Sequence, residues 1–147
     1  MSARRIPLSH GGHLTGWHPV RPGHGSVPFE SALERDAITW LSQWPGFCRL
    51  VAQPITVEYL RADGRLAHYT PDLWVIFDPL PGALQARGFG AETYIEVKYA
   101  LEAEPLADRL TWLQAAVERE TQRPWVLLTE RAVRAAGRPR LRWLPPP

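Results

Sequence analysis

The sequence holds a single cysteine, Cys48, among its 147 residues. One thiol cannot form an intramolecular disulfide or a cysteine zinc site, which agrees with a reducing compartment. No apolar run approaches the roughly 20 residues of a membrane helix, and the start "MSARRIPLSHGGHL" lacks the continuous apolar core of a signal peptide. We therefore expect a cytoplasmic protein that does not engage a membrane.

Acidic residues are missing from both ends of the chain. None precedes Glu30 and none follows Glu130. The arginines of these acid-free ends are Arg4, Arg5, Arg21, Arg131, Arg134, Arg138, Arg140 and Arg142. Such ends suit a polyanion, because arginine on phosphate displaces counterions and supplies sequence-independent affinity. The alternative is that the ends are solvated tails without a partner.

The overall composition, with 45% apolar and 22% charged residues, is typical of one globular domain. Residues 1–28 are rich in Gly, Pro and His without periodicity and predict an irregular basic arm. Residues 29–147 are expected to form one domain. The histidines of "HGGHLTGWH" match no familiar metal-ligand spacing, which favours a flexible or DNA-touching arm over a metal site.

Hydrophobic periodicity predicts alternating helices and strands after this arm. A helical stripe runs from Phe29 to Trp44 and ends at "PG", and an Asp63-Gly64 turn marks a hairpin. The further expected elements are strands at "DLWVIF" (72–77), "TYIEVKYA" (93–100), "PWVLL" (124–128) and "LRWL" (141–144), and a helix at 105–121. This order predicts an α/β fold with a mixed sheet flanked by helices.

Three charged residues stand in or beside two of these apolar strands. The strand period of two places Glu96 and Lys98 on one face of "YIEVKYA". If "DLWVIF" pairs beside it, Asp72 approaches Glu96, and two carboxylates repel unless a cation lies between them. Oxygen ligands suit Mg²⁺ or Mn²⁺, and the lysine can orient the attacking water or stabilise charge on phosphate. These are the parts of metal-assisted phosphodiester hydrolysis.

Each of these residues also has an ordinary structural interpretation. Glu96 and Lys98 can form a solvated cross-strand pair, and Asp72 can close a turn after Pro71. A further acid is expected on the first helix, where Glu34 borders the apolar stripe. "SALE" (31–34) is also a capping box, in which Glu34 bonds back to the backbone at Ser31. Glu30, one turn earlier, is the other candidate.

The P-D at 71–72 followed by E-x-K at 96–98 resembles the signature of the PD-(D/E)xK nuclease superfamily. A wider series then resembles the N-terminal catalytic domain of TnsA, the endonuclease subunit of heteromeric cut-and-paste transposases. The series is "FESALERDAITWL", "AQPITVEYL", "DGRLAHYTPDLWV", "YIEVK" and "RPWVLLTERAV", in that order, over roughly residues 17–135. Gln53-Pro54 matches the Q-P that precedes the hairpin in this family, and we expect a structural role for it.

The resemblance implies a restriction-endonuclease-like fold and a Mg²⁺- or Mn²⁺-dependent cut, with one or two ions, at the 5′ ends of the transposon. It implies catalytic roles for Glu34, Asp72, Glu96 and Lys98, and metal ligation by Glu34, Asp72, Glu96 and Val97. The implied partners are double-stranded DNA at the transposon ends and a TnsB-type transposase, with a TnsC-type AAA regulator as a further candidate.

Two departures from the family pattern matter. Full-length members continue into a winged-helix-like domain that meets TnsC, whereas here no second C-terminal domain is expected after "LRWLPPP". Residues 78–92 form a longer loop, either an insertion of no consequence or a DNA-facing element. The alternative functions are a restriction, repair or phage nuclease of the same superfamily, and a catalytically silent module that binds DNA or a transposase.

Overall fold

The centre of the fold is a four-stranded mixed sheet. The computed structural model of the chain describes residues 16–19 and 25–135. Within them the sheet has the order β3-β6-β7-β8, made of β3 (Phe47–Ala52), β6 (Leu73–Phe77), β7 (Glu92–Val97) and β8 (Trp125–Leu128). β6 pairs antiparallel with β3 and β7, whereas β7 and β8 are parallel. The predicted mixed sheet is confirmed.

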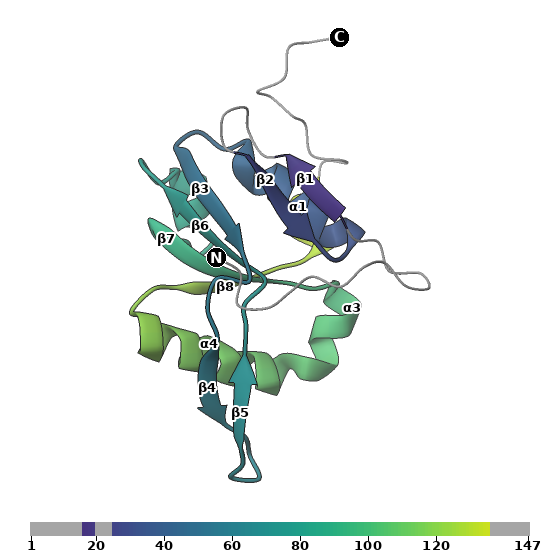
Figure 1. The fold of residues 1–147 in the computed structure, drawn as a ribbon, viewed down its shortest axis with the longest axis vertical. Helices are drawn as coiled ribbons and strands as arrows, with labels where there is room; N and C mark the ends of the chain where they lie inside the picture. The colour runs from purple at the N-terminus through teal and green to yellow at the C-terminus, as the bar shows by residue number, and fades with distance from the viewer. Residues whose placement is uncertain (1–15, 20–24, 136–147) are drawn as a thin grey trace.

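Helices cover both faces of this sheet (Figure 1). One face carries α1 (Ala32–Ser42) and a small antiparallel hairpin of β1 (Gly16–Pro19) and β2 (Ser26–Phe29). The other face carries α4 (Ala107–Thr121), which is crossed by a second hairpin of β4 (Val57–Leu60) and β5 (Leu66–Tyr69). The short helices are α2 (Gly82–Gln85), α3 (Ala100–Ala103), the 3₁₀ turn η1 (Glu104–Leu106) and α5 (Glu130–Val133).

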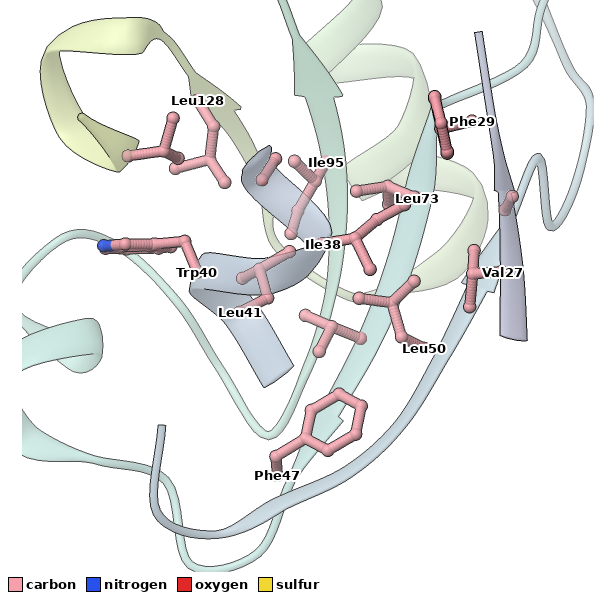
Figure 2. Close-up of a cluster of buried hydrophobic side chains, with 14 of the residues drawn as sticks. Val27, Phe29, Ile38, Trp40, Leu41, Phe47, Leu50, Leu73, Ile95 and Leu128 are labelled. Carbon is pink, nitrogen blue, oxygen red and sulfur yellow. The ribbon is translucent and has the colours of Figure 1, made fainter. Parts of the chain in front are cut away.

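The alternating side chains of the strands divide the interior into two cores. Ile95 of β7 faces the α1 side, where Leu73, Ile38 and Leu41 join it, all with no measurable exposure. Figure 2 shows these side chains meeting between α1 and the sheet. The neighbouring Tyr94 faces the other core, under α4. Each fully buried aliphatic side chain contributes about 1.5–3 kcal/mol, so the two cores fix the position of β7 from both sides.

The first helix begins later than its apolar stripe predicts. Ser31 is the N-cap, and its Oγ accepts a hydrogen bond from the Glu34 amide at 3.0 Å. Phe29 therefore ends β2 instead of starting the helix, although its ring is buried in the same core. The extended conformation at Ser31 (φ −151°, ψ 162°) is what an N-cap requires.

The irregular arm predicted for residues 1–28 is wrong where β1 and most of β2 form a hairpin. Val27 and Phe29 of β2 are buried, and His18 of β1 lies 2.6 Å from the Thr39 hydroxyl of α1 through its Nε2. The hairpin is therefore packed on the domain. His10, His13 and His24 lie outside the described residues, as does the strand expected at 141–144.

The loop at residues 78–92 is also more than a solvent-exposed insertion. It contains α2, and its Leu84 and Phe89 are buried in the core that faces α1. Phe89 meets Phe77 of β6 edge to face, with ring centroids 6.5 Å apart. The loop thus helps to hold the far ends of the two strands whose near ends carry Asp72 and Glu96.

The second hairpin and the long helix follow the prediction closely. Gly64 takes φ +81° in the predicted Asp63-Gly64 turn, a conformation that favours glycine. Leu106, Leu110, Leu113 and Val117 line the face of the helical segment that packs against the hairpin and the sheet. None of the helices in the described part of the chain is long and apolar enough to cross a membrane.

Candidate active site

Asp72 stands immediately before β6 and bonds across to the end of β7. Its Oδ2 accepts a hydrogen bond from the Val97 amide at 2.7 Å, while its own carbonyl accepts one from the Gln53 amide at 2.8 Å. The register pairs Leu73 with Ile95, so the residue before Leu73 falls beside the residues that follow Ile95. Antiparallel pairing therefore brings Asp72 to the E-x-K segment, as the sequence predicted.

Glu96 and Lys98 lie on one face of β7, the face toward α4. Together with Asp72 they line a hollow of about 290 Å³, whose other walls include Tyr69 of β5 and Leu110 and Leu113 of α4. The Lys98 Nζ is 3.8 Å from Glu96 Oε2, and the two side chains are 25% and 12% exposed. The pair is thus largely withdrawn from water, unlike the solvated cross-strand pair that was the structural alternative.

A hydrogen-bonded chain that the sequence did not reveal orients Glu96. The Tyr69 hydroxyl donates to Glu96 Oε1 at 2.6 Å, and the indole Nε1 of Trp125 donates to the Tyr69 oxygen at 2.9 Å. Tyr69 and Trp125 are both buried. Burial and the charge of Glu96 raise the pKa of Tyr69 far above its usual value, so the phenol keeps its proton and stays a donor.

The charge of Asp72 is unfavourable in this surrounding. Its pKa lies well above the ordinary value, first because burial penalises the carboxylate and then because Glu96 and Glu34 add negative charge nearby. The Val97 amide and Lys98 oppose this rise. Asp72 therefore has two further acids near enough for their charges to act on it.

Glu34 lies in the first turn of a capped helix, and its carboxylate bonds to the backbone before that helix. Ser31 caps the helix as in a capping box, but the Glu34 carboxylate bonds the backbone amide of Glu30 at 3.1 Å instead of that of Ser31. Glu34 is only 9% exposed, and its charge raises the pKa of Asp72. Of the two candidate helix acids, Glu34 is the one whose charge contributes to the raised pKa of Asp72, although it is not among the residues that line the hollow.

Glu30, the other candidate acid, is hydrogen-bonded to the Gln53 side chain. The Gln53 side chain donates to Glu30 Oε1 at 3.1 Å, and Gln53 itself is 1% exposed with φ +48°. Because the Gln53 amide also bonds the Asp72 carbonyl, this residue joins the start of α1 to the start of β6. Gln53 thus contacts both Glu30 and the backbone of Asp72, and these contacts support the structural role expected for the Gln-Pro segment.

Val97 reaches the site only through its backbone. Its side chain packs on the α1 side, while its amide donates to Asp72. The N–H and C=O of one strand residue are directed at the same neighbouring strand. The Val97 carbonyl therefore also faces the edge at which Asp72 stands, as a ligand role would require.

The donor set of this hollow fits a hard divalent cation. Within residues 16–19 and 25–135, no group of three His, Cys, Asp or Glu side chains is arranged to hold a metal ion by itself. Mg²⁺, however, is usually held by one or two protein carboxylates and completes its shell with water and substrate phosphate. Asp72 and Glu96 supply such a pair. Burial first, and then the charges of Glu96 and Glu34, raise the pKa of Asp72, and a bound cation would oppose that rise.

Comparisons with known proteins add no relative to this chain: no protein-family model matches it, and no curated protein matches it.

Proposed function

We propose that the chain is a metal-dependent DNA endonuclease with a restriction-endonuclease-like core, acting as the TnsA-type subunit of a heteromeric transposase. The observation that carries the proposal is the meeting of Asp72 and Glu96 at the paired ends of β6 and β7, with Lys98 on the same wall of the hollow. The mixed sheet with helices on both faces is compatible with such a core.

Asp72 and Glu96 would hold Mg²⁺ or Mn²⁺, with the Val97 carbonyl and Glu34 as the further oxygen donors. Such an ion lowers the pKa of bound water and stabilises negative charge on phosphate. Tyr69 holds Glu96 in place by its short hydrogen bond, and Asp72 is held by the Val97 amide. The carboxylates are thus oriented before any ligand arrives, which reduces the cost of reorganisation during the reaction.

Lys98 is the group of this site that acts on the nucleophile or on the phosphate. Its amine is 3.8 Å from Glu96 Oε2, and Lys98 lines the hollow together with Asp72 and Glu96. A protonated amine there orients the attacking water and stabilises the added negative charge of the pentavalent phosphate. The leaving 3′ oxygen takes up a proton, and the 5′ phosphate keeps the oxygen that came from water.

The transposase context rests on the order of the motifs around this site. The first helix with Glu34, the Gln-Pro segment, the hairpin, the P-D strand and the E-x-K strand follow one another as in TnsA. In this proposal the enzyme cuts the 5′ ends of the element, and a TnsB-type transposase positions it there and handles the 3′ ends. A TnsC-type regulator is a further candidate partner.

Nicking of supercoiled plasmid in Mg²⁺ or Mn²⁺, alone and with a co-encoded transposase, tests this function. We expect wild-type nicking and a loss of at least about 100-fold in Asp72→Ala and in Lys98→Ala. Asp108→Ala, which changes an exposed acid on α4, is the control and should cleave normally. Nicking that survives both active-site changes would refute this centre, and a wild type that stays inactive with its transposase would favour a binding module.

A further inference from the structure

A second hollow opens beside the one that holds the acids. It has a volume of about 490 Å³ and lies between the β4–β5 hairpin and α4. Arg61, Tyr59, Arg109 and Trp112 are among the residues that line it. His68 and Arg109 line both hollows, so the two join into one groove that leads from Asp72 and Glu96 along the hairpin.

Arg109 is the cation at the junction of the two hollows. It is exposed on α4, and no ion pair or side-chain hydrogen bond involves its guanidinium in the part of the chain that the structure describes. An arginine of this kind has five N–H donors directed at solvent and matches the oxygens of a phosphate. Lys98 of the first hollow provides a second positive charge toward the acids.

The other basic side chains of the groove are held only by weak, exposed pairs. His68 lies 3.3 Å from Glu58, and Arg61 lies 3.7 Å from Asp63, with each of these four side chains roughly half exposed or more. Exposed pairs of this kind contribute little to stability, so a phosphate can replace the carboxylate partner. Asp63 is the acid among the residues lining the second hollow, and it stands at the hairpin turn.

Trp112 gives the groove an apolar wall. Its side chain is 43% exposed, on the same helix as Arg109 and one turn further along. An exposed indole next to a phosphate-binding cation offers a surface for a sugar or a base. The groove thus begins at the acids and offers both basic side chains and an aromatic side chain. The basic side chains suit the phosphates of a nucleic-acid strand, and the aromatic side chain suits its sugars or bases.

We propose that the groove between the β4–β5 hairpin and α4 binds the backbone of the DNA strand that is cut, with Arg109 on a phosphate beside the scissile one. This inference rests on the proposed function, since the groove begins at the proposed centre. Arg61 and His68 contact the backbone further along the hairpin. Such contacts position the strand and carry no sequence information.

Binding of a fluorescent 30-base-pair duplex, followed by anisotropy in EDTA over a series of salt concentrations, tests the groove separately from cleavage. We expect Arg109→Ala to weaken binding about tenfold at low salt and to lower the slope of log affinity against log salt by about one. Arg109→Lys should keep the slope, because it retains the charge, and lose part of the affinity.

Arg119→Ala is the matched control. Arg119 lies on the same helix and is also exposed, but it is 3.9 Å from Glu120. It lines a third hollow, which shares Tyr59 and Trp112 with the groove but includes neither Arg109 nor the acids of the proposed centre. It should leave affinity and slope unchanged, and all three variants should melt at the wild-type temperature. The groove proposal would be overturned, even if the wild type nicks DNA, by either of two results. One is a slope of log affinity against log salt that does not change in Arg109→Ala, and the other is an equal loss of affinity in Arg119→Ala. A wild type that neither binds nor nicks would overturn both proposals.

Discussion

Tyr69 is the residue on which the position of Glu96 depends most directly. It joins the hairpin to the acid by a 2.6 Å hydrogen bond and is itself held by Trp125. The sequence placed Tyr69 and Trp125 in strands but gave no sign of these hydrogen bonds, because the two residues are 56 positions apart and come together only in the folded chain. The period of two along β5 does indicate that Tyr69 points inward with Ala67.

Removing the Tyr69 hydroxyl should weaken cleavage without unfolding the protein. Tyr69→Phe keeps the ring in the core but takes away the donor to Glu96, so we expect nicking to fall about 10- to 100-fold, with a weaker apparent affinity for Mn²⁺. Nicking rates over a Mn²⁺ titration measure both. Tyr94→Phe changes another buried tyrosine of the same core, one that lines neither hollow, and serves as the control. Equal effects of the two changes would show that Tyr69 acts only through packing.

Asp72→Asn should exchange activity for stability. The amide carries no charge, so the repulsion from Glu96 and Glu34 that raises the pKa of Asp72 disappears. We expect a higher melting temperature at pH 7.5 in the absence of divalent ions, and no measurable nicking. Asp108→Asn, on the exposed first turn of α4, should change the unfolding free energy by less than about 0.5 kcal/mol. A lower melting temperature in Asp72→Asn would contradict this electrostatic account.

At the scale of elements, the sequence revealed the strands that are regular and missed those that are not. The hairpin, β7 and α4 follow a regular period, whereas β6 and β8 are continuous apolar runs, and all of these elements were predicted. β3 was missed because a register shift between Phe47 and Arg49 interrupts its alternation and leaves Cys48 and Arg49 exposed. β1 and β2 were missed because Gly16, Pro19 and Pro28 are uncommon in strands. Their pairing with each other and the packing of β2 on α1 and β3 hold them extended.

The β1–β2 hairpin should detach first when the pH falls. Burial and the charge of Arg35 lower the pKa of His18, while Asp36 opposes this shift, so the folded state favours the neutral imidazole that meets Thr39. Between this lowered pKa and the ordinary value near 6.5, the unfolded state binds more protons, and stability falls as the pH falls through that window. The stability is fully present above pH 6.5.

Melting temperatures of the wild type and His18→Gln from pH 5 to pH 8 measure this effect. We expect the wild type to lose stability faster than His18→Gln on acidification, with the two curves parallel above pH 7. His68→Gln, an exposed histidine on the other hairpin, is the control and should not flatten the curve. Parallel curves for the wild type and His18→Gln over the whole range would show that His18 does not couple the hairpin to α1.

Ile95 connects the core to the chemistry, because its neighbours in β7 carry the acid and the backbone donor of the site. Ile95→Ala leaves a cavity against Ile38 and Leu73 in a region without measurable exposure, so we expect a loss of about 2–5 kcal/mol in the free energy of unfolding. Urea denaturation measures it. Leu101→Ala, at a side chain that is 79% exposed, should cost less than about 0.5 kcal/mol. Similar costs at both positions would contradict the placement of Ile95.

For the whole molecule, the sequence indicated which acids approach one another. It did not indicate which of the arginines are already paired with acids. Arg134 belongs to the basic end of the chain, yet its Nε lies 2.8 Å from Asp36 Oδ2 and ties the segment after α5 to α1. Arg109, in the middle of the chain, has no such partner among the described residues and stands at the groove. Spacing along the chain shows which residues are charged, whereas only the packed elements show which charges are already paired.

In the proposed centre, Asp72 and Glu96 are held together so that a divalent cation completes the site. Calorimetric titration of Mn²⁺ into the full chain, with and without a 30-base-pair duplex, tests it most directly, with Asp72→Asn and Glu96→Gln as variants and Asp108→Asn as control. We expect the wild type and the control to bind Mn²⁺, and both active-site variants to lose this binding. Binding that survives both substitutions, or a wild type that binds no Mn²⁺ with or without DNA, would contradict it.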